Sequence, residues 1–79
     1  MATVNSPMRG IFYAAPSPDE PPFVKEGQKV SKGDVLCLVE AFKMFNEVEA
    51  EQSGTIVRCL VENATEVDGD QPMFEIKLD

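Results

Sequence analysis

The chain has 79 residues, of which 14 are acidic and 7 are basic, so its net charge is −7 at pH 7. A chain of this length forms one domain with a modest core, which leaves little room for a deep catalytic cleft. The negative charge repels phosphate backbones and anionic lipid, which argues against nucleic-acid and membrane partners. No apolar run is long enough to cross a bilayer. The first residues also lack the basic start and hydrophobic stretch of a signal peptide.

Strand-like runs recur along the chain between Gly, Pro, Asp and Asn, and no stretch has helical periodicity. The runs cover residues 11–13, 35–39, 48–50, 55–57 and 74–78, the last of which alternates Phe74, Ile76 and Leu78 with charged residues. Likewise Glu47, Glu49 and Glu51 alternate with apolar residues, so we interpret them as a solvated strand face and not as a catalytic carboxylate pair. The pattern predicts an all-β sandwich or flattened barrel.

The two halves of the chain resemble each other. Val24, Val30, Cys37 and Val39 match Val61, Val67, Phe74 and Ile76 at an offset of 37, while Val4, Ser6 and Gly10 match Val48, Ala50 and Gly54 at an offset of 44. The offsets differ by seven residues, which predicts an insertion between Gly10 and Val24. Its candidate is residues 14–22, whose four prolines block sheet pairing. We predict two β units related by a rough two-fold axis; chance self-similarity of a β protein is the alternative.

The apolar run 35–50 is too long for one strand, since strands are usually about 3–10 residues long. A two-residue hairpin centred on Phe42 and Lys43, with Ala41 paired to Met44, fits the reversal. Tight hairpin turns favour Asn, Asp or Gly, and this one has none of them. A local rule broken at a hairpin tip indicates a functional demand. The alternative is an ordinary surface lysine with hydrophobic neighbours.

Two cysteines, Cys37 and Cys59, are the only ones in the chain, which has no histidine. They are not spaced as a CxxC pair, and a zinc site would need carboxylates to complete it, so we expect no metal site. Each cysteine lies in an apolar run, which predicts two buried, reduced thiols of a cytosolic or organelle-matrix protein. The alternative is a disulfide, which would indicate an oxidising compartment.

The turn segment Glu40-Ala41-Phe42-Lys43-Met44 resembles the Glu-Ala-Met-Lys-Met box of biotinyl domains, whose lysine accepts biotin. The resemblance covers nearly the whole chain. Ser6-Pro7-Met8-Arg9-Gly10 and Phe12-Tyr13 look like the first strands of the biotin carboxyl carrier proteins of acetyl-CoA carboxylase, Pro16-Ser17-Pro18-Asp19 looks like their thumb, and Gly27, Gly33-Asp34 and Ser53-Gly54-Thr55 match their turns. Phe42 departs from the family's usual methionine, because it keeps the bulk but loses the flexible thioether.

This resemblance implies a flattened β-barrel or sandwich of two antiparallel four-stranded sheets with quasi-two-fold symmetry, the hammerhead fold. It further implies a single biotinyl domain over residues 1–79, expected to be the C-terminal domain of a longer subunit, with a thumb at about 15–22. The implied site has no catalytic residue. Its cofactor-binding residues are Lys43, which takes the covalent biotin, the hairpin residues Glu40, Ala41, Phe42 and Met44, and the thumb residues Pro16, Ser17, Pro18 and Asp19.

The implied function is that of a carrier. A biotin protein ligase would attach biotin, a biotin carboxylase would carboxylate it, and a carboxyltransferase would pass the carboxyl group to an acyl-CoA, expected to be acetyl-CoA in fatty acid biosynthesis. The implied location is the bacterial cytoplasm or the plastid stroma, and the isolated domain is expected to be monomeric. We also expect the proline-rich loop to fold over the Lys43 hairpin.

Two alternatives share this fold. Lipoyl domains usually have Asp before and Ala after their lysine, so Phe42 and Met44 favour biotin over lipoate. The other alternative is an interaction module whose Lys43 is never modified.

Overall fold

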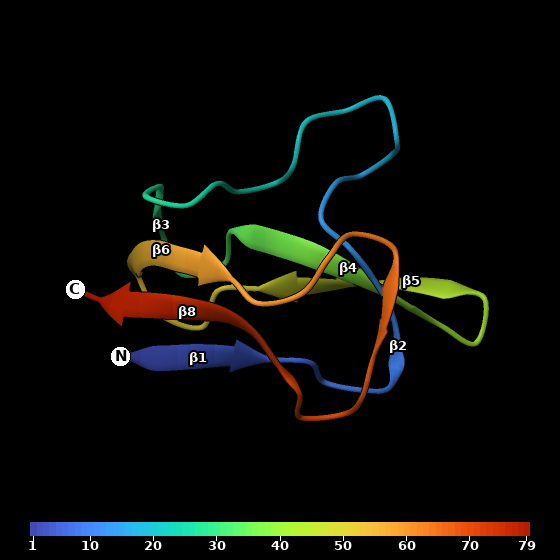
Figure 1. The fold of residues 1–79 in the computed structure, drawn as a ribbon. Coiled ribbons are helices and arrows are strands. Elements are labelled where there is room, and N and C mark those ends of the chain that lie inside the picture. The colour runs from blue at the N-terminus through green and yellow to red at the C-terminus, as the bar shows by residue number, and fades with distance from the viewer.

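The computed structural model describes all 79 residues and contains eight β-strands and no helix (Figure 1). The strands are β1 (Ala2–Asn5), β2 (Gly10–Tyr13), β3 (Lys29–Val30), β4 (Val35–Ala41), β5 (Met44–Glu49), β6 (Gly54–Cys59), β7 (Thr65–Val67) and β8 (Pro72–Leu78). They form two antiparallel four-stranded sheets in the orders β1-β8-β6-β3 and β5-β4-β2-β7. The predicted all-β class is therefore confirmed. No helix is long and apolar enough to span a membrane.

The quasi-two-fold repeat is confirmed by the sheet topology. Exchanging β1, β8, β6 and β3 for β5, β4, β2 and β7 converts one strand order into the other. The pairing registers also match, because Ala2 pairs with Ile76 as Asn46 pairs with Val39, at the offsets of 44 and 37 found in the sequence. Each sheet thus contains strands from both halves of the chain, so neither half forms a sheet alone.

Two glycines occupy equivalent crowded positions in the repeat. A Cβ atom on Gly10 would lie 2.4 Å from the carbonyl oxygen of Glu40, and one on Gly54 would lie 2.5 Å from that of Lys77. These distances are far below van der Waals contact, and the obstructing atoms belong to the backbone. Both positions therefore need glycine so that neighbouring strands can approach closely.

The turns around β3 and β7 also repeat. The backbone has positive φ at Gly27 (87°) and Gly33 (94°), and at the matching Ala64 (63°) and Asp70 (65°). The N–H group of Gly27 donates to the carbonyl of Ile56 and that of Ala64 to the carbonyl of Phe12, both at 2.7 Å. The tertiary hydrogen bonds fix the turn conformation even where the residue is not glycine.

Twelve apolar side chains form the core between the sheets: Phe12, Val30, Leu36, Cys37, Val39, Val48, Ala50, Ile56, Val67, Met73, Phe74 and Ile76. Phe12 and Phe74, one from each sheet, have ring centroids 6.0 Å apart and an interplanar angle of 57°. This tilted contact is typical of stabilising aromatic pairs. All four residue pairs matched at the offset of 37 contribute to the core or pack against it.

Burial differs from the sequence-based expectation at two residues. Cys37 is fully buried as predicted, but Cys59 is exposed, so the prediction of two buried thiols was wrong. Cys59 is the last residue of β6, and the final two residues of that strand are both exposed, so Cys59 lies where the strand leaves the core. Leu78 is 41% exposed because it is the last residue of β8, where no residue of β1 pairs with it. Both cysteines are unpaired.

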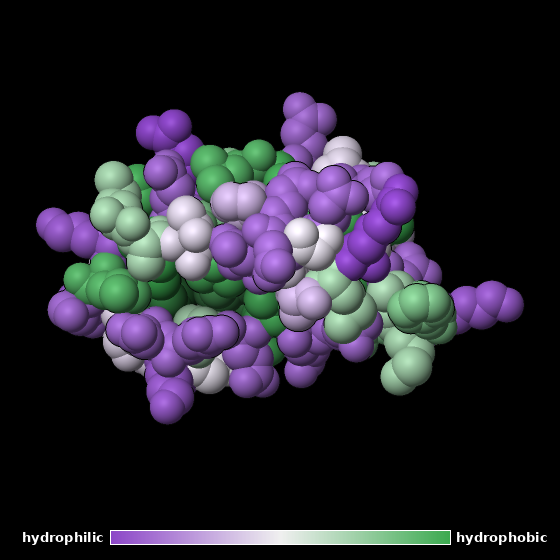
Figure 2. Space-filling model, turned by 90° about the horizontal axis from the view of Figure 1, so that it is seen from below, coloured by the Kyte–Doolittle hydropathy of each residue, from purple (hydrophilic) through white to green (hydrophobic).

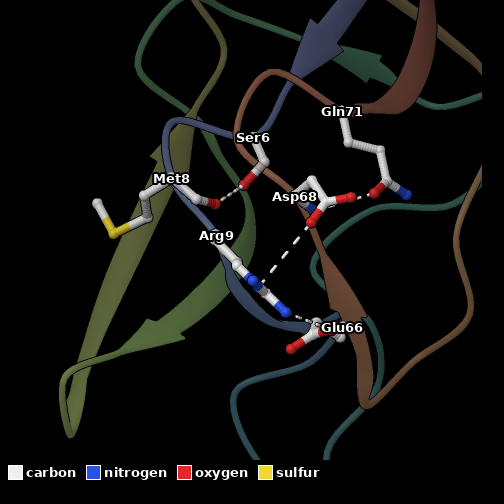
Figure 3. Close-up of polar contacts among 6 residues, drawn as sticks. All are labelled: Ser6, Met8, Arg9, Glu66, Asp68 and Gln71. Atoms are coloured by element: carbon white, nitrogen blue, oxygen red, sulfur yellow. Dashed lines mark hydrogen bonds and ion pairs between the residues drawn. The ribbon is translucent and has the colours of Figure 1, made fainter.

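A polar cluster ties the β1–β2 connection to β7 and the turn that follows it (Figure 3). Arg9 Nη2 lies 3.3 Å from Glu66 Oε1, and Arg9 Nε lies 3.9 Å from Asp68 Oδ1. Ser6 Oγ donates to the carbonyl of Met8 at 2.6 Å. The ion pairs are exposed and contribute little stability. They have no equivalent in the other half, where the residue matching Arg9 is Ser53.

Candidate functional site at the β4–β5 hairpin

The hairpin turn has the geometry that the sequence predicted. Ala41 pairs with Met44, and the two residues between them, Phe42 (φ 52°) and Lys43 (φ 61°), both have positive φ. A type I′ turn requires positive φ at both central positions. Residues other than glycine pay about 1–2 kcal/mol each for this conformation. Such local strain at a surface turn supports a functional role for the two residues.

Lys43 is exposed and takes part in no hydrogen bond or ion pair. Its neighbours are large apolar groups that are also exposed: Phe42 at 94%, Met44 at 65% and Phe45 at 61%. The hairpin lies at the right-hand end of the molecule in Figures 1 and 2, and Figure 2 shows hydrophobic side chains at this end and a hydrophilic side chain extending beyond them. Clustered exposed apolar groups mark an interaction site. The amine of Lys43 is therefore accessible from solvent, and its neighbours on the turn are exposed apolar side chains.

The hairpin projects from the end of the molecule opposite the chain termini (Figure 1). The repeat explains this placement. In one sheet β4 and β5 are joined by the turn at Phe42 and Lys43, while their counterparts β8 and β1 are left open as the two ends of the chain. The lysine turn and the termini are thus the two-fold equivalents of each other. A partner can therefore approach Lys43 at the end of the domain that lies away from both termini.

The base of the hairpin is held by a third strand. Glu40 of β4 pairs with Phe45 of β5, and Tyr13 of β2 contacts both. The Tyr13 hydroxyl donates to Glu40 Oε1 at 3.1 Å, and the Tyr13 ring centroid lies 5.9 Å from that of Phe45. The hydrogen bond to Glu40, with some desolvation, raises the pKa of Tyr13 above its ordinary value. Sequence reasoning used Tyr13 only as a strand residue; its nearness to Glu40 depends on the β2–β4 register.

The proline-rich insertion lies beside the base of the hairpin. Its ends meet where the N–H group of Phe23 donates to the carbonyl of Ala14 at 2.9 Å, so residues 15–22 form a closed loop. Pro16 and Tyr13 border a cavity of about 330 Å³ between the loop and the hairpin sheet. The other lining residues are Ala15, Ser17, Pro18, Leu38, Phe45, Asn63 and Ala64.

No hydrogen bond or ion pair joins this loop to residues 40–44. Pro18 and Asp19 are exposed and Ser17 is half-buried. The structure thus brings the loop to the base of the hairpin, and contact between the loop and a group on Lys43 stays a prediction.

No other arrangement of reactive side chains suggests chemistry. No group of three or more Cys, Asp or Glu residues is placed to hold a metal ion. Lys43 lines none of the grooves on the surface. The site can therefore offer a modifiable amine on a shaped turn, and it does not enclose a substrate.

Comparisons with known proteins agree with this geometry. A family model described as "Biotin-requiring enzyme" matches residues 2–76. The chain is 59% identical over 73 residues to the biotin carboxyl carrier protein of acetyl-CoA carboxylase from Pseudomonas aeruginosa, covering 92% of this chain and 47% of that protein. It is 54% identical over 74 residues to the chloroplastic carrier protein of acetyl-CoA carboxylase from Glycine max, covering 94% of this chain and 28% of that protein. The chain therefore spans less than half the length of these relatives.

A solved structure of a single-chain, multi-domain long-chain acyl-CoA carboxylase superposes on 99% of this chain and 7% of its own chain, with a TM-score of 0.83. The two sequences are 20% identical there, so this likeness supports the fold alone.

Proposed function

Since the chain belongs to the family of biotin-requiring enzymes, we propose that it is a biotin carboxyl carrier whose Lys43 holds the cofactor through an amide bond. The observation that carries the proposal is the exposed, unpartnered Lys43 at a strained type I′ turn between Phe42 and Met44. A carrier needs an accessible amine and no catalytic cleft of its own, and this chain offers that combination.

Attachment would consume the amine of Lys43. The amide would form between Nζ and the carboxyl carbon of the biotin side chain with overall loss of water, the ligase supplying the carboxyl group in activated form, and it would remove one positive charge, which changes the formal net charge from −7 to −8. When bound, biotin supplies the ureido group that carries the carboxyl group. The residues of the chain orient this group: the turn sets its direction, and Phe42 and Met44 present the apolar surface that a partner recognises.

The proposed partners are a biotin protein ligase, a biotin carboxylase and a carboxyltransferase that acts on an acyl-CoA, with acetyl-CoA as the expected acceptor because both relatives are named for acetyl-CoA carboxylase. A tethered cofactor moves between two active sites without dissociating, which raises its effective concentration at each. The relatives include bacterial and chloroplastic proteins, so the proposed location is the bacterial cytoplasm or the plastid stroma.

Intact-mass measurement after co-expression with a biotin protein ligase tests the proposal. We expect the mass to rise by one biotinyl group, and we expect Lys43→Arg to abolish the increase completely. Lys32→Arg is the matched control, since Lys32 is also exposed and lies in a turn between strands, and this variant should be labelled as the parent is.

Persistent biotinylation of Lys43→Arg would contradict the assignment of the site. Co-expression with a lipoate ligase distinguishes the related carrier type, because labelling by that enzyme alone would replace biotin with lipoate as the cofactor.

A further inference from the structure

The internal repeat separates what the fold requires from what the hairpin requires. The crowded glycines, the left-handed turns and the core positions occur in both halves. The cluster of Tyr13, Glu40 and Phe45 occurs only once in the repeat, at the hairpin end. Its two-fold counterparts, at the offsets of 44 and 37, are Val57, Lys77 and Met1. They adjoin one another at the end with the termini, where all three border one shallow groove, but valine has neither a hydroxyl group nor an aromatic ring.

From this contrast we propose that Tyr13 is a positioning residue that fixes the base of the β4–β5 hairpin and so sets the direction in which Lys43 projects. The effect of Tyr13 on cofactor delivery rests on the proposed function, whereas the effect of Tyr13 on the hairpin does not.

The strand register shows why the hairpin needs such support. Ile11 pairs with Glu40, and no residue of β2 pairs with Ala41 or beyond. From Ala41 to Met44 the hairpin is therefore two strands wide, and β5 is an edge strand with no neighbour on its other side. An isolated two-stranded hairpin is only marginally stable in water. The boundary at the Glu40–Phe45 pair is where the projecting tip would bend.

Tyr13 acts at that boundary on both strands. Its backbone pairs with Leu38, but its side chain reaches the next pair that faces the same side, Glu40 and Phe45. The hydroxyl donates to Glu40 on β4, and the ring packs on Phe45 of β5. One side chain thus restrains both strands where the third strand ends. The raised pKa of Tyr13 agrees with this role, because the hydroxyl stays protonated and remains a donor throughout the neutral range.

The same residue connects the hairpin to the proline-rich loop. Tyr13 directly precedes Ala14, whose carbonyl closes the loop by accepting the Phe23 N–H group. Its ring also forms part of the wall of the cavity bordered by Pro16. A change in the orientation of Tyr13 would therefore alter the loop and the hairpin together.

Amide hydrogen exchange of residues 41–45, followed by NMR on the whole chain, tests the proposal. Tyr13→Phe removes the hydroxyl and keeps the ring, and it should speed exchange in this segment about fivefold, the loss expected for one net hydrogen bond. Tyr13→Val installs the residue found at position 57, which the equivalent backbone already accepts, and should speed exchange further. Glu40→Gln keeps an acceptor oxygen for Tyr13 and should leave the rates near those of the parent.

Val57→Ala is the matched control, since it weakens packing at the opposite end and should leave exchange of residues 41–45 unchanged. Exchange in that segment that is unaltered in both Tyr13 variants would overturn the proposal. So would a uniform rise across both sheets, because that result indicates general destabilisation. A rise confined to the hairpin supports it.

Ligase kinetics then separate this proposal from the proposed function. If Tyr13 positions Lys43, Tyr13→Phe raises the KM for the carrier several-fold and leaves kcat near the parent value, because the amine itself is unchanged. An unlabelled parent chain would refute the biotin assignment, while the exchange experiment would still decide the role of Tyr13.

Discussion

The two halves of the molecule have the same backbone plan and differ mainly where the long strands end. In the second sheet β4 and β5 meet in a closed turn that presents Lys43, and in the first sheet the equivalent strands β8 and β1 end as the chain termini. The shared features are those of a stable hammerhead: close-packed glycines, left-handed turns and an alternating core. The features without a counterpart are the closed turn, the proline-rich loop and the Tyr13 cluster. They are therefore the best candidates for function, because the equivalent positions at the other end of the repeat keep the same backbone plan without them.

The two halves also differ in the charges of their equivalent exposed positions. Lys25 and Lys29 match Glu62 and Glu66 at the offset of 37, so equivalent exposed positions carry opposite charges. The fold tolerates either sign at these places. Exposed charges are thus free to serve solubility or partner choice, whereas the buried positions are not free to vary in this way.

At neutral pH, the largest effect on stability should come from the two crowded glycines. Gly10→Ala and Gly54→Ala should each lower the free energy of unfolding by about 1–3 kcal/mol, since their Cβ atoms would overlap backbone carbonyls. Urea denaturation measures both. Gly69→Ala is the control, because its nearest atom would be 3.9 Å away, and it should change stability by less than about 0.5 kcal/mol. Strongly unequal effects at residues 10 and 54 would break the equivalence of the halves.

The two cysteines should respond differently to pH and to thiol reagents. Burial, with a smaller contribution from Cys59, raises the pKa of Cys37 to about 12, against an ordinary value of 9.0. The unfolded chain thus loses this proton first, and stability should fall between about pH 9 and 12 by at most about 1.4 kcal/mol per pH unit. Cys37→Val should remove this part of the slope in urea denaturation at stepped pH.

Near pH 8, Cys59 should react with a thiol reagent in the native state and Cys37 only after unfolding, and equal reactivity would contradict the burial assigned to Cys37.

Exchanging turn residues between the halves should change the free energy of unfolding by a smaller amount. The two substitutions should have opposite signs. Gly27→Ala should lower the free energy of unfolding, and Ala64→Gly should raise it, each by about 0.5–1 kcal/mol, because both positions have positive φ. No atom within 4 Å would obstruct the new methyl group at Gly27, so the effect comes from the backbone alone. Thermal denaturation of the two variants provides the comparison. A gain in stability for Gly27→Ala would show that the turns are not equivalent.

Removing the loop should have the smallest effect on stability. Replacing residues 15–22 by a short glycine turn makes the first half resemble the second, and Ala14 and Phe23 already meet through a hydrogen bond. The free energy of unfolding should change by no more than about 1 kcal/mol, because loop length contributes weakly. Lys43 should still accept biotin from the ligase. A variant that no longer folds would show that the loop is part of the core structure.

The sequence alone determined the fold class, the repeat with its insertion, and the position of the turn at Phe42 and Lys43. These features follow from local chemistry: alternation marks the strands, glycine and proline mark their limits, and a run too long for one strand must reverse. The lysine box also predicted Lys43 as the candidate site without any coordinates. Each of these signals lies within a short stretch of the chain, or in two stretches compared directly.

Only the tertiary structure decided which side chains meet at the base of the hairpin and which ends of strands leave the core. Tyr13 and Glu40 are 27 residues apart, and their contact depends on the register of β2 against β4. Cys59 lies in an apolar run, yet it is the last residue of β6, where the strand leaves the core and its final two residues are exposed. Pairing register and its local shifts depend on how both halves pack together, and a one-residue change reverses the facing of a whole strand. Such long-range choices leave no mark in a local pattern.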